Sequence, residues 1–585
     1  MHTDYINYLQ SMNNANSSND NAIAESQFIN PFYEKIRVES NIGNFLIDKI
    51  KEKPTFIFLT GHAGDGKTSL LYQILRQFNA ISAGVPLKEE DYVDNTYNNK
   101  KIYYVKDMSE LVSNKQVGCI KQGVITVSEE GSCIIVSNTG TLIDALKKYF
   151  YGSKFSASEI EMDILKLMDE NSFVEGNVGD ISVLVVNLAL IDNTEIVSKL
   201  IDNLLEEELW QGSDTCELKE ACPIHNNYKT LKQHQEHFKQ FAMNYYRWLA
   251  DNDKRLTIRQ ILSHLSYSIT GNIQCQNINV INQQRILFDY HISNLFFGYV
   301  GIDVNNDAQK IKSISEIQSL NLDEKKLIFD QELFVKEDFS NLIDEVQPIA
   351  KDIWNYYTKR QIYDTTHLLY GETPVKIRKA MRRMQMLFAD ITDEQKEILY
   401  GDLYSPIFVR YLDYRTNGMR VRAKRQLKEI IFKALQILIM GDNGDISSSS
   451  ILYLPLKRSG LNNQNVYLLV GKIDYESLSI ETIEKESVVS TNPVYQIVVK
   501  FDRLSKEYIL SLPLLEYFYQ IANGSLSTKL NPVLSQGIYK LKAQLYREYK
   551  FTDDEEVIKL LIQTLRGPKI IDIELDIENK KLYFN

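Results

Sequence analysis

One run of the sequence constrains the fold more than any other. The apolar stretch Thr55–Leu59 passes almost directly into Gly61-His62-Ala63-Gly64-Asp65-Gly66-Lys67-Thr68. This is the Walker A pattern G-x-x-x-x-G-K-T, a phosphate-binding loop between a strand and a helix. Its glycines let backbone N–H groups curl around a triphosphate, and the helix that follows points its positive dipole end at the same oxygens. The run therefore predicts an α/β domain that binds a nucleotide.

The positions of this loop have separate expected tasks. Lys67 is expected to reach the β and γ phosphates, and Thr68 to hold Mg²⁺. ATP and Mg²⁺ are therefore the predicted ligands. The other predicted nucleotide contacts come from Gly61, His62, Ala63, Gly64, Asp65, Gly66 and Ser69.

Composition narrows the class of protein. The chain has 585 residues, enough for several domains, and a net charge of −11, which argues against a globally basic nucleic-acid coat. Any contact with DNA must then use a local patch. No apolar run approaches the roughly 20 residues of a membrane span, and the N-terminus is polar, so we expect a cytoplasmic protein without membrane contact. Five cysteines without regular spacing argue against a disulfide framework.

The pattern after the loop predicts a parallel α/β sheet. Strand-like runs recur at Ile102–Val105, Cys133–Val136 and Val183–Val186, separated by segments long enough for crossover helices. From Asn226 onward the apolar spacing is mostly helical. The predicted domains are an N-terminal arm (1–50), a P-loop core (51–225), a helical lid (226–340), a helical middle domain (341–441) and a C-terminal α+β module (442–585).

The C-terminal module is expected to mix strands and helices. Ile451–Leu456, Val466–Val470 and Val494–Phe501 resemble strands, followed by helices through Leu565 and a last strand at Lys569–Leu575. The turn-rich run Gly441-Asp442-Asn443-Gly444-Asp445 favours a loop at the boundary before this module.

A P-loop ATPase also needs an acid for the water shell of Mg²⁺, usually an Asp that ends a strand beside the P-loop strand. Asp107 follows the run Ile102–Val105 and is the candidate, although an acid at a strand end is also common in ordinary turns. The next residue is Met108, where hydrolytic P-loop ATPases commonly carry Glu. Glu110 is therefore the nearest acid that can polarise a water, and the departure puts the rate of hydrolysis in doubt.

Two kinds of side chain are candidates for sensing the γ-phosphate. Asn138 ends the strand-like run Cys133–Val136, as the sensor 1 Asn does in AAA+ enzymes, where it sits between the two Walker elements; an ordinary Asx-turn is the alternative. Asn187 is a weaker rival for the same role. Arg255 and Arg259 stand just before a helical segment, where an AAA+ lid presents its sensor 2 arginine, and Arg259 is taken as the nucleotide contact.

Two other groups of residues carry weaker signals. Cys216, Cys222, His225 and Cys275 could supply soft ligands for zinc, but their spacing matches no tight C-x₂-C pair. Two basic clusters stand out in an acidic chain; they are either solvated helix faces or a contact for the phosphates of DNA. Their candidate DNA contacts are Lys376, Arg378, Lys379, Arg382 and Arg383 in the first, and Arg420, Arg422, Lys424 and Arg425 in the second.

The chain resembles the DptF family, also called DndF, the P-loop ATPases of bacterial phosphorothioation-dependent DNA restriction. The resemblance implies an ATPase subunit that works with two partner subunits, one of them helicase-like, to restrict DNA that lacks phosphorothioate marks. It rests on Gly61–Thr68, Asp107–Glu110, Ser137–Gly140, Cys222-Pro223 with Asn227, Arg255–Arg259 with Ile269–Gly271, and Leu512–Glu516.

Together these patterns predict an AAA+-like ATPase in antiviral DNA restriction, with Lys67, Asp107, Glu110 and Asn138 in catalysis. No nuclease motif is recognisable in the sequence. Two alternatives stay open: a STAND-type nucleotide switch in defence signalling, and a scaffold subunit that binds ATP without turnover. A homo-oligomer is compatible with each.

Overall fold

The computed structural model divides the chain into two compact units, Met1–Leu399 and Tyr400 onward. The predicted boundary run Gly441–Asp445 lies outside the residues that the structure describes. In the described part, no helix is both long and apolar enough to cross a membrane. The structure describes residues 2–13, 30–79, 81–82, 85–95, 100–170, 172–274, 278, 283–363, 372–440, 450–456, 466–485, 493–525, 530–551, 557–564, 567–576 and 579–584.

The first unit is built around a six-stranded sheet in the order β2-β3-β4-β1-β6-β5. The four central strands, β3, β4, β1 and β6, are parallel, as the spacing of apolar runs predicts. The two edge strands, which the sequence pattern did not predict, are antiparallel to their neighbours. The strands are β1 (Phe56–Thr60), β2 (Glu90–Asn95), β3 (Lys100–Val105), β4 (Ser132–Val136), β5 (Phe173–Val178) and β6 (Ile181–Asn187).

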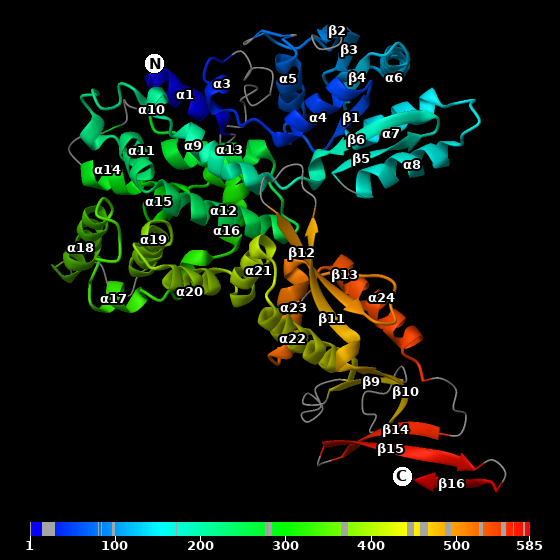
Figure 1. The fold of residues 1–585 in the computed structure, drawn as a ribbon. Helices are drawn as coiled ribbons and strands as arrows, with labels where there is room; N and C mark the ends of the chain where they lie inside the picture. Colours follow the sequence, from blue (N-terminus) through cyan, green and yellow to red (C-terminus); the bar gives the residue numbers. More distant parts are fainter. Residues whose placement is uncertain are drawn as a thin grey trace. The chain divides into compact units, whose positions relative to one another are not determined.

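Helices cover both faces of this sheet, because side chains alternate along each strand. Ile57 and Leu59 pack toward α4 (Asn41–Glu52) and α5 (Lys67–Gln77). Phe56 and Phe58 of the same strand pack into the opposite core. That core is formed with α6 (Ser113–Ser128), α7 (Thr139–Tyr149) and α8 (Ala157–Glu170) (Figure 1). The result is a three-layer α/β arrangement.

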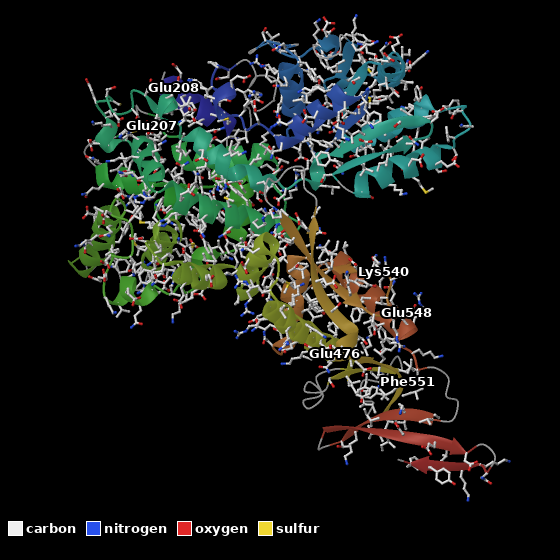
Figure 2. The ribbon with its side chains drawn as sticks, viewed as in Figure 1. Glu207, Glu208, Glu476, Lys540, Glu548 and Phe551 are labelled. Carbon is white, nitrogen blue, oxygen red and sulfur yellow. The ribbon has the colours of Figure 1, made fainter. Side chains whose placement is uncertain are left out.

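The segment expected to be an N-terminal arm packs against two different parts of the first unit. The helix α1 (His2–Met12) packs against α13 (Ile258–Thr270), where Gln10 donates a hydrogen bond to the Ile273 carbonyl. The helix α4 instead contributes Leu46 and Ile50 to the core of the sheet. Between them stands α3 (Tyr33–Ile36), whose Lys35 pairs with Glu208 at 2.7 Å. Glu207 and Glu208 begin α10 (Glu207–Trp210) and are labelled in Figure 2.

The rest of the first unit is mostly helical, as expected for residues 226–340. It also contains a small hairpin of β7 (Tyr299–Val300) and β8 (Asp303–Val304). Its helices are α9 (Val197–Leu204), α10 (Glu207–Trp210), α11 (Pro223–Gln233), α12 (Gln235–Asp251), α13, α14 (Gln283–Asp289), α15 (Ile292–Leu295), α16 (Lys312–Ser319), α17 (Asp330–Val335), α18 (Gln347–Tyr363), α19 (Glu372–Phe388) and α20 (Asp393–Leu403), which runs across the division.

The second unit combines helices with two antiparallel sheets, of orders β16-β15-β14-β10-β9 and β11-β12-β13. Its helices are α21 (Pro406–Asn417), α22 (Val421–Met440), α23 (Leu512–Ala522) and α24 (Pro532–Glu548). Its strands are β9 (Ile451–Leu456), β10 (Val466–Asp474), β11 (Leu478–Lys485), β12 (Val494–Phe501), β13 (Tyr508–Ile509), β14 (Val557–Thr564), β15 (Gly567–Asp576) and β16 (Lys581–Phe584).

The sequence pattern did not predict β11, β13, β14 or β16, and β14 falls where a helix was expected. The helices expected through Leu565 end earlier, because Val557–Thr564 is the strand β14. Its apolar run fits a strand or a helix equally well, so pairing with β10 and β15 decides. Cross-strand partners share a face, which places Leu560 and Ile571 on one face of the sheet and the pair Lys559 and Asp572 on the other.

Candidate functional site

The predicted phosphate loop connects β1 to α5 at the carboxyl end of the parallel strands. Every residue of β1 is buried, and the helix begins at Lys67. Gly64 and Gly66 have φ angles of +88° and +86°, in the left-handed region that favours glycine. A Cβ atom at Gly64 would also lie 3.0 Å from the hydroxyl oxygen of Thr257. The two glycines are therefore needed for both the turn and the close approach of α13.

The ammonium of Lys67 lies inside the loop. Its Nζ donates to the carbonyl oxygens of Gly61 and His62, both at 3.0 Å, and to Oδ1 of Asn138 at 3.3 Å. Only 7% of the residue is exposed, and this burial lowers the pKa of Lys67, while the charges of Asp107 and Asp65 oppose the shift. Two of the predicted catalytic residues, Lys67 and Asn138, are thus in direct contact.

Asp107 and Asn138 come from the ends of neighbouring strands. Contrary to the expectation for Asp107, its strand β3 is not beside β1, because β4 lies between them. Ser109 joins the two strand ends: its N–H donates to Asp107 Oδ1 at 2.8 Å, and its hydroxyl accepts from the N–H of Asn138 at 3.2 Å. Ser109 is a positioning residue that the sequence pattern did not single out.

Glu110 stands beside a second lysine. Its carboxylate lies 3.8 Å from Nζ of Lys106, and the side chain of Glu110 is 57% exposed whereas that of Lys106 is 9% exposed. Both residues line the same cavity as Lys67 and Asp107. Glu110 can therefore reach solvent and the cavity from one position.

Asn187 is engaged elsewhere. Its side chain donates to the Met168 carbonyl and accepts from the N–H of Ala189, at 3.0 and 3.1 Å. Asn138, by contrast, lines the cavity. Of the two asparagines, the geometry therefore favours Asn138 as the polar strand end beside the phosphate loop.

The two arginines before α13 differ in what they contact. Arg255 donates to Asp65 Oδ1 at 2.8 Å and to the carbonyl oxygens of Leu188 and Ile191. Arg259 lines the cavity, and its burial lowers the pKa of its guanidinium. Its charge also lowers the pKa of Lys67, so the two cations lie close enough to act on one anion.

Most of these groups line one cavity of about 290 Å³; Ser109, Asn187 and Arg255 do not. Its polar lining residues include Lys67, Thr68, Asp107, Glu110, Asn138 and Arg259. Its apolar lining residues include Ile36, Val38, Ile42, Ile196, Leu200 and Leu262. The apolar lining was not predicted, because its residues come from three distant segments whose apolar spacing resembles ordinary core.

The remaining loop residues are distributed around this cavity. Ala63, Gly64, Asp65, Gly66 and Ser69 line it. His62 is exposed, and Gly61 is buried at the end of β1. The hydroxyl of Ser69 lies 3.0 Å from that of Tyr33, which ties α5 to α3.

The candidate zinc ligands do not form a site in the described part of the chain. Cys222 is buried and Cys216 is half-buried. His225 lies 3.8 Å from Asp214, and Cys275 falls outside the described residues. Among the described side chains, no three His, Cys, Asp or Glu residues come together in a way that could hold a metal.

The first basic cluster differs from its prediction. Arg383 is completely buried, with Nη1 2.7 Å from Asp323 Oδ2, so this side chain cannot contact DNA. Arg382 makes a two-pronged contact with Asp330, at 3.0 and 2.7 Å. Lys376 and Lys379 pair with Asp303 and Glu324. The guanidinium of Arg378 stacks over Phe334 at 5.8 Å. Most of this cluster is therefore neutralised inside the unit.

The second basic cluster lies largely at the surface of its unit. Arg420, Arg422 and Arg425 are exposed at the start of α22, and Lys424 is half-buried. The structure gives these four side chains no ion pair with any residue it describes. Nearby, Lys428 is engaged with Glu476, at 3.2 Å.

Comparisons of the chain with family models, with curated proteins and with solved structures found no match. The function therefore has to follow from the chemistry of the site.

Proposed function

We propose that this protein is a Mg²⁺-dependent ATPase of the AAA+-like type that serves as a subunit of a bacterial DNA restriction complex. One observation carries the proposal: Lys67, Thr68, Asp107, Asn138 and Arg259 line a single cavity at the mouth of a glycine loop. Each of these residue types has a task in phosphoryl transfer, and they come from four separate segments of the chain.

The polar residues that line the cavity suit a triphosphate. The loop N–H groups and the start of α5 supply an anion site, and Lys67 supplies a cation at its centre. Arg259 adds a second cation from α13. A buried lysine and a half-buried arginine beside the N–H groups of the loop favour a polyphosphate over a neutral ligand.

The oxygen donors fit Mg²⁺. Thr68 and Asp107 both line the cavity, and a hydroxyl and a carboxylate are ligands that Mg²⁺ accepts. Mg²⁺ usually takes only one or two protein ligands and keeps substrate oxygens and waters for the rest. When bound, it would neutralise charge on the transferred phosphoryl group.

Hydrolysis also needs a group that orients water. Glu110 and Asn138 are the candidates, and Ser109 links the strand ends that carry them. Nζ of Lys106 lies 3.8 Å from the carboxylate of Glu110, and a carboxylate at this place is the type of group that accepts a proton from water. The apolar lining residues, among them Ile36, Val38 and Leu200, give a nucleobase a surface on which to pack.

The strand order supports the AAA+-like type. The strand with Asn138 lies between the P-loop strand and the strand with Asp107, which is the place of the sensor 1 residue in that class. Coupling to DNA is supported by the exposed basic residues at the start of α22, and the restriction complex by the resemblance to the DptF family. The partner subunits, one helicase-like, belong to the same proposal.

One observation favours a second candidate, an ATP-binding scaffold without turnover. Met108, which occupies the place of the usual catalytic Glu, is completely buried and cannot act on water. A STAND-type switch has no such support in the structure.

The proposal is tested by ATP binding and turnover of the purified chain, with and without duplex DNA at about 50 mM salt, where phosphate contacts are strong. We expect DNA-stimulated turnover that disappears in Lys67→Ala, because the central cation is lost. Glu110→Gln separates the two candidates: a catalyst loses most of its kcat, whereas a scaffold is unaffected. Absence of ATP binding by the wild-type chain would contradict both.

A further inference from the structure

The phosphate loop of this protein contains a buried acid, Asp65. Asp65 is 3% exposed, lies between Gly64 and Gly66 in the loop, and is one of the residues that line the cavity. One oxygen, Oδ2, accepts from the N–H of His62 at 2.8 Å and so holds the turn of the loop. A buried carboxylate needs a cation, because leaving it unpaired is strongly unfavourable.

Arg255 supplies that cation from the segment before α13. Its Nη1 lies 2.8 Å from Asp65 Oδ1, and the pair is 20% exposed on the arginine and 0% on the aspartate. Its Nη2 and Nε donate to the carbonyl oxygens of Leu188 and Ile191 at 2.8 and 2.7 Å. With its Nε and both Nη nitrogens donating to protein oxygens, this guanidinium is committed to the protein rather than to a phosphate.

The same segment also contacts the loop through its backbone. The N–H of Arg259 donates to the carbonyl of Gly64 at 3.3 Å, one residue before Asp65. The start of α13 is therefore joined to the phosphate loop at Gly64 and at Asp65. Both contacts lie beside the side chain of Arg259, which lines the cavity.

We infer that Arg255 is a positioning residue: it cancels the charge of Asp65 and fixes the phosphate loop against the Leu188–Ile191 turn, so that the loop accepts a triphosphate. The inference rests on the proposed nucleotide site. It assigns different tasks to the two arginines, since Arg259 is left to act on the phosphates and Arg255 acts on them only through Asp65.

The test is the dissociation constant of ATP, measured by calorimetry on the full chain for Arg255→Gln, Asp65→Asn and the double variant. We expect Arg255→Gln to weaken ATP binding roughly 10- to 100-fold, the effect of one uncompensated charge a few ångströms from a polyphosphate. The double variant should return to within about threefold of wild type, because no charge is left to cancel. In turnover, Arg255→Gln should raise KM and change kcat little.

A matched control is Arg382→Gln. Arg382 and Asp330 form a comparable pair, 17% and 9% exposed, within the same unit but outside the cavity. This variant should lower the thermal midpoint of unfolding without changing ATP affinity. If Arg255→Gln fails to fold, Arg255→Lys keeps the charge and should retain most of the affinity.

Two results would overturn the inference: normal ATP binding by Arg255→Gln, or weakened binding that Asp65→Asn does not restore. The thermal midpoint without nucleotide is a second readout, in which Arg255→Gln should be destabilised and Asp65→Asn should recover part of the loss. Failure of the wild-type chain to bind ATP would instead contradict the proposed function, and the midpoints would still test the pairing.

Discussion

The helices α19 and α22 carry similar runs of basic residues, yet their side chains have opposite environments. In α19, Arg382 and Arg383 are held by Asp330 and Asp323 and lie away from solvent. In α22, Arg422 and Arg425 are exposed at the first turns, where positive charge is unfavourable to the helix dipole. The difference shows that a run of basic residues forms an exposed basic surface only where no acidic side chain from another element pairs with it.

Among the basic residues of the two helices, Arg383 is expected to have the largest effect on stability. Its guanidinium contacts Asp323, Asn294 and the Gly301 carbonyl and stacks on Tyr299 at 3.8 Å. We expect Arg383→Met to lower the free energy of unfolding by about 3 to 5 kcal/mol, because Asp323 is left buried without a partner. Urea unfolding followed by tryptophan fluorescence measures this.

The control for that variant adds Asp323→Leu. Replacing both charges by apolar side chains should recover much of the loss, since no unpaired charge stays buried. A loss below about 1 kcal/mol for Arg383→Met alone would mean that α19 is as exposed as α22.

A smaller loss of folding stability is expected at acidic pH. His291, which packs against Phe388 of α19, and His264 are fully buried, and burial lowers the pKa of each to about 4. The unfolded chain binds these protons near pH 6.5, so stability is complete above that pH and falls between about 6.5 and 4, by at most about 3 kcal/mol for each histidine. Denaturation curves across this range measure the slope.

His291→Asn sharpens this prediction. His291 caps α15 by accepting from the N–H of Ser293, and Asn is also a good N-cap. The variant should remove about half of the acid-dependent loss that the two histidines cause together. An unchanged slope would assign the acid sensitivity to other groups.

The smallest effect on stability is expected in α22. Arg422→Gln with Arg425→Gln should change the free energy of unfolding by no more than about 0.5 kcal/mol. The affinity for duplex DNA should fall, and the slope of log K against log salt should decrease by about 0.9 for each phosphate contact removed. Arg382→Gln is the control, and an identical salt slope in the double variant would exclude these residues from the contact.

Much of the sheet followed from the sequence, and the edges did not. The central strands are buried on both faces and so form short apolar runs, such as Ile102–Val105. The edge strand β2, Glu90–Asn95, is largely polar and pairs with β3 alone, so no apolar pattern marks it. The strand β14 was missed for another reason, because its apolar run has no distinct period.

The candidate site was predictable where a local motif carries it. Gly64, Gly66 and Lys67 lie within four consecutive residues, so the local sequence is enough to predict their geometry. The ion pair of Asp65 and Arg255 spans 190 positions, and Ser109 meets Asn138 across two strand ends. Such contacts depend on the order of strands in the sheet, which one sequence does not specify.

The pairing of β14 with β15 has a consequence for how this part of the chain can change. Leu560 faces Ile571, and Ile558 faces Ile573, while the intervening pair Lys559 and Asp572 points to the opposite side. Inserting or deleting one residue inside either strand would move every later side chain of that strand to the opposite face of the sheet. A change of two residues would keep each side chain on its original face. Natural length variation in these strands should therefore come in even steps, with odd steps confined to the turns.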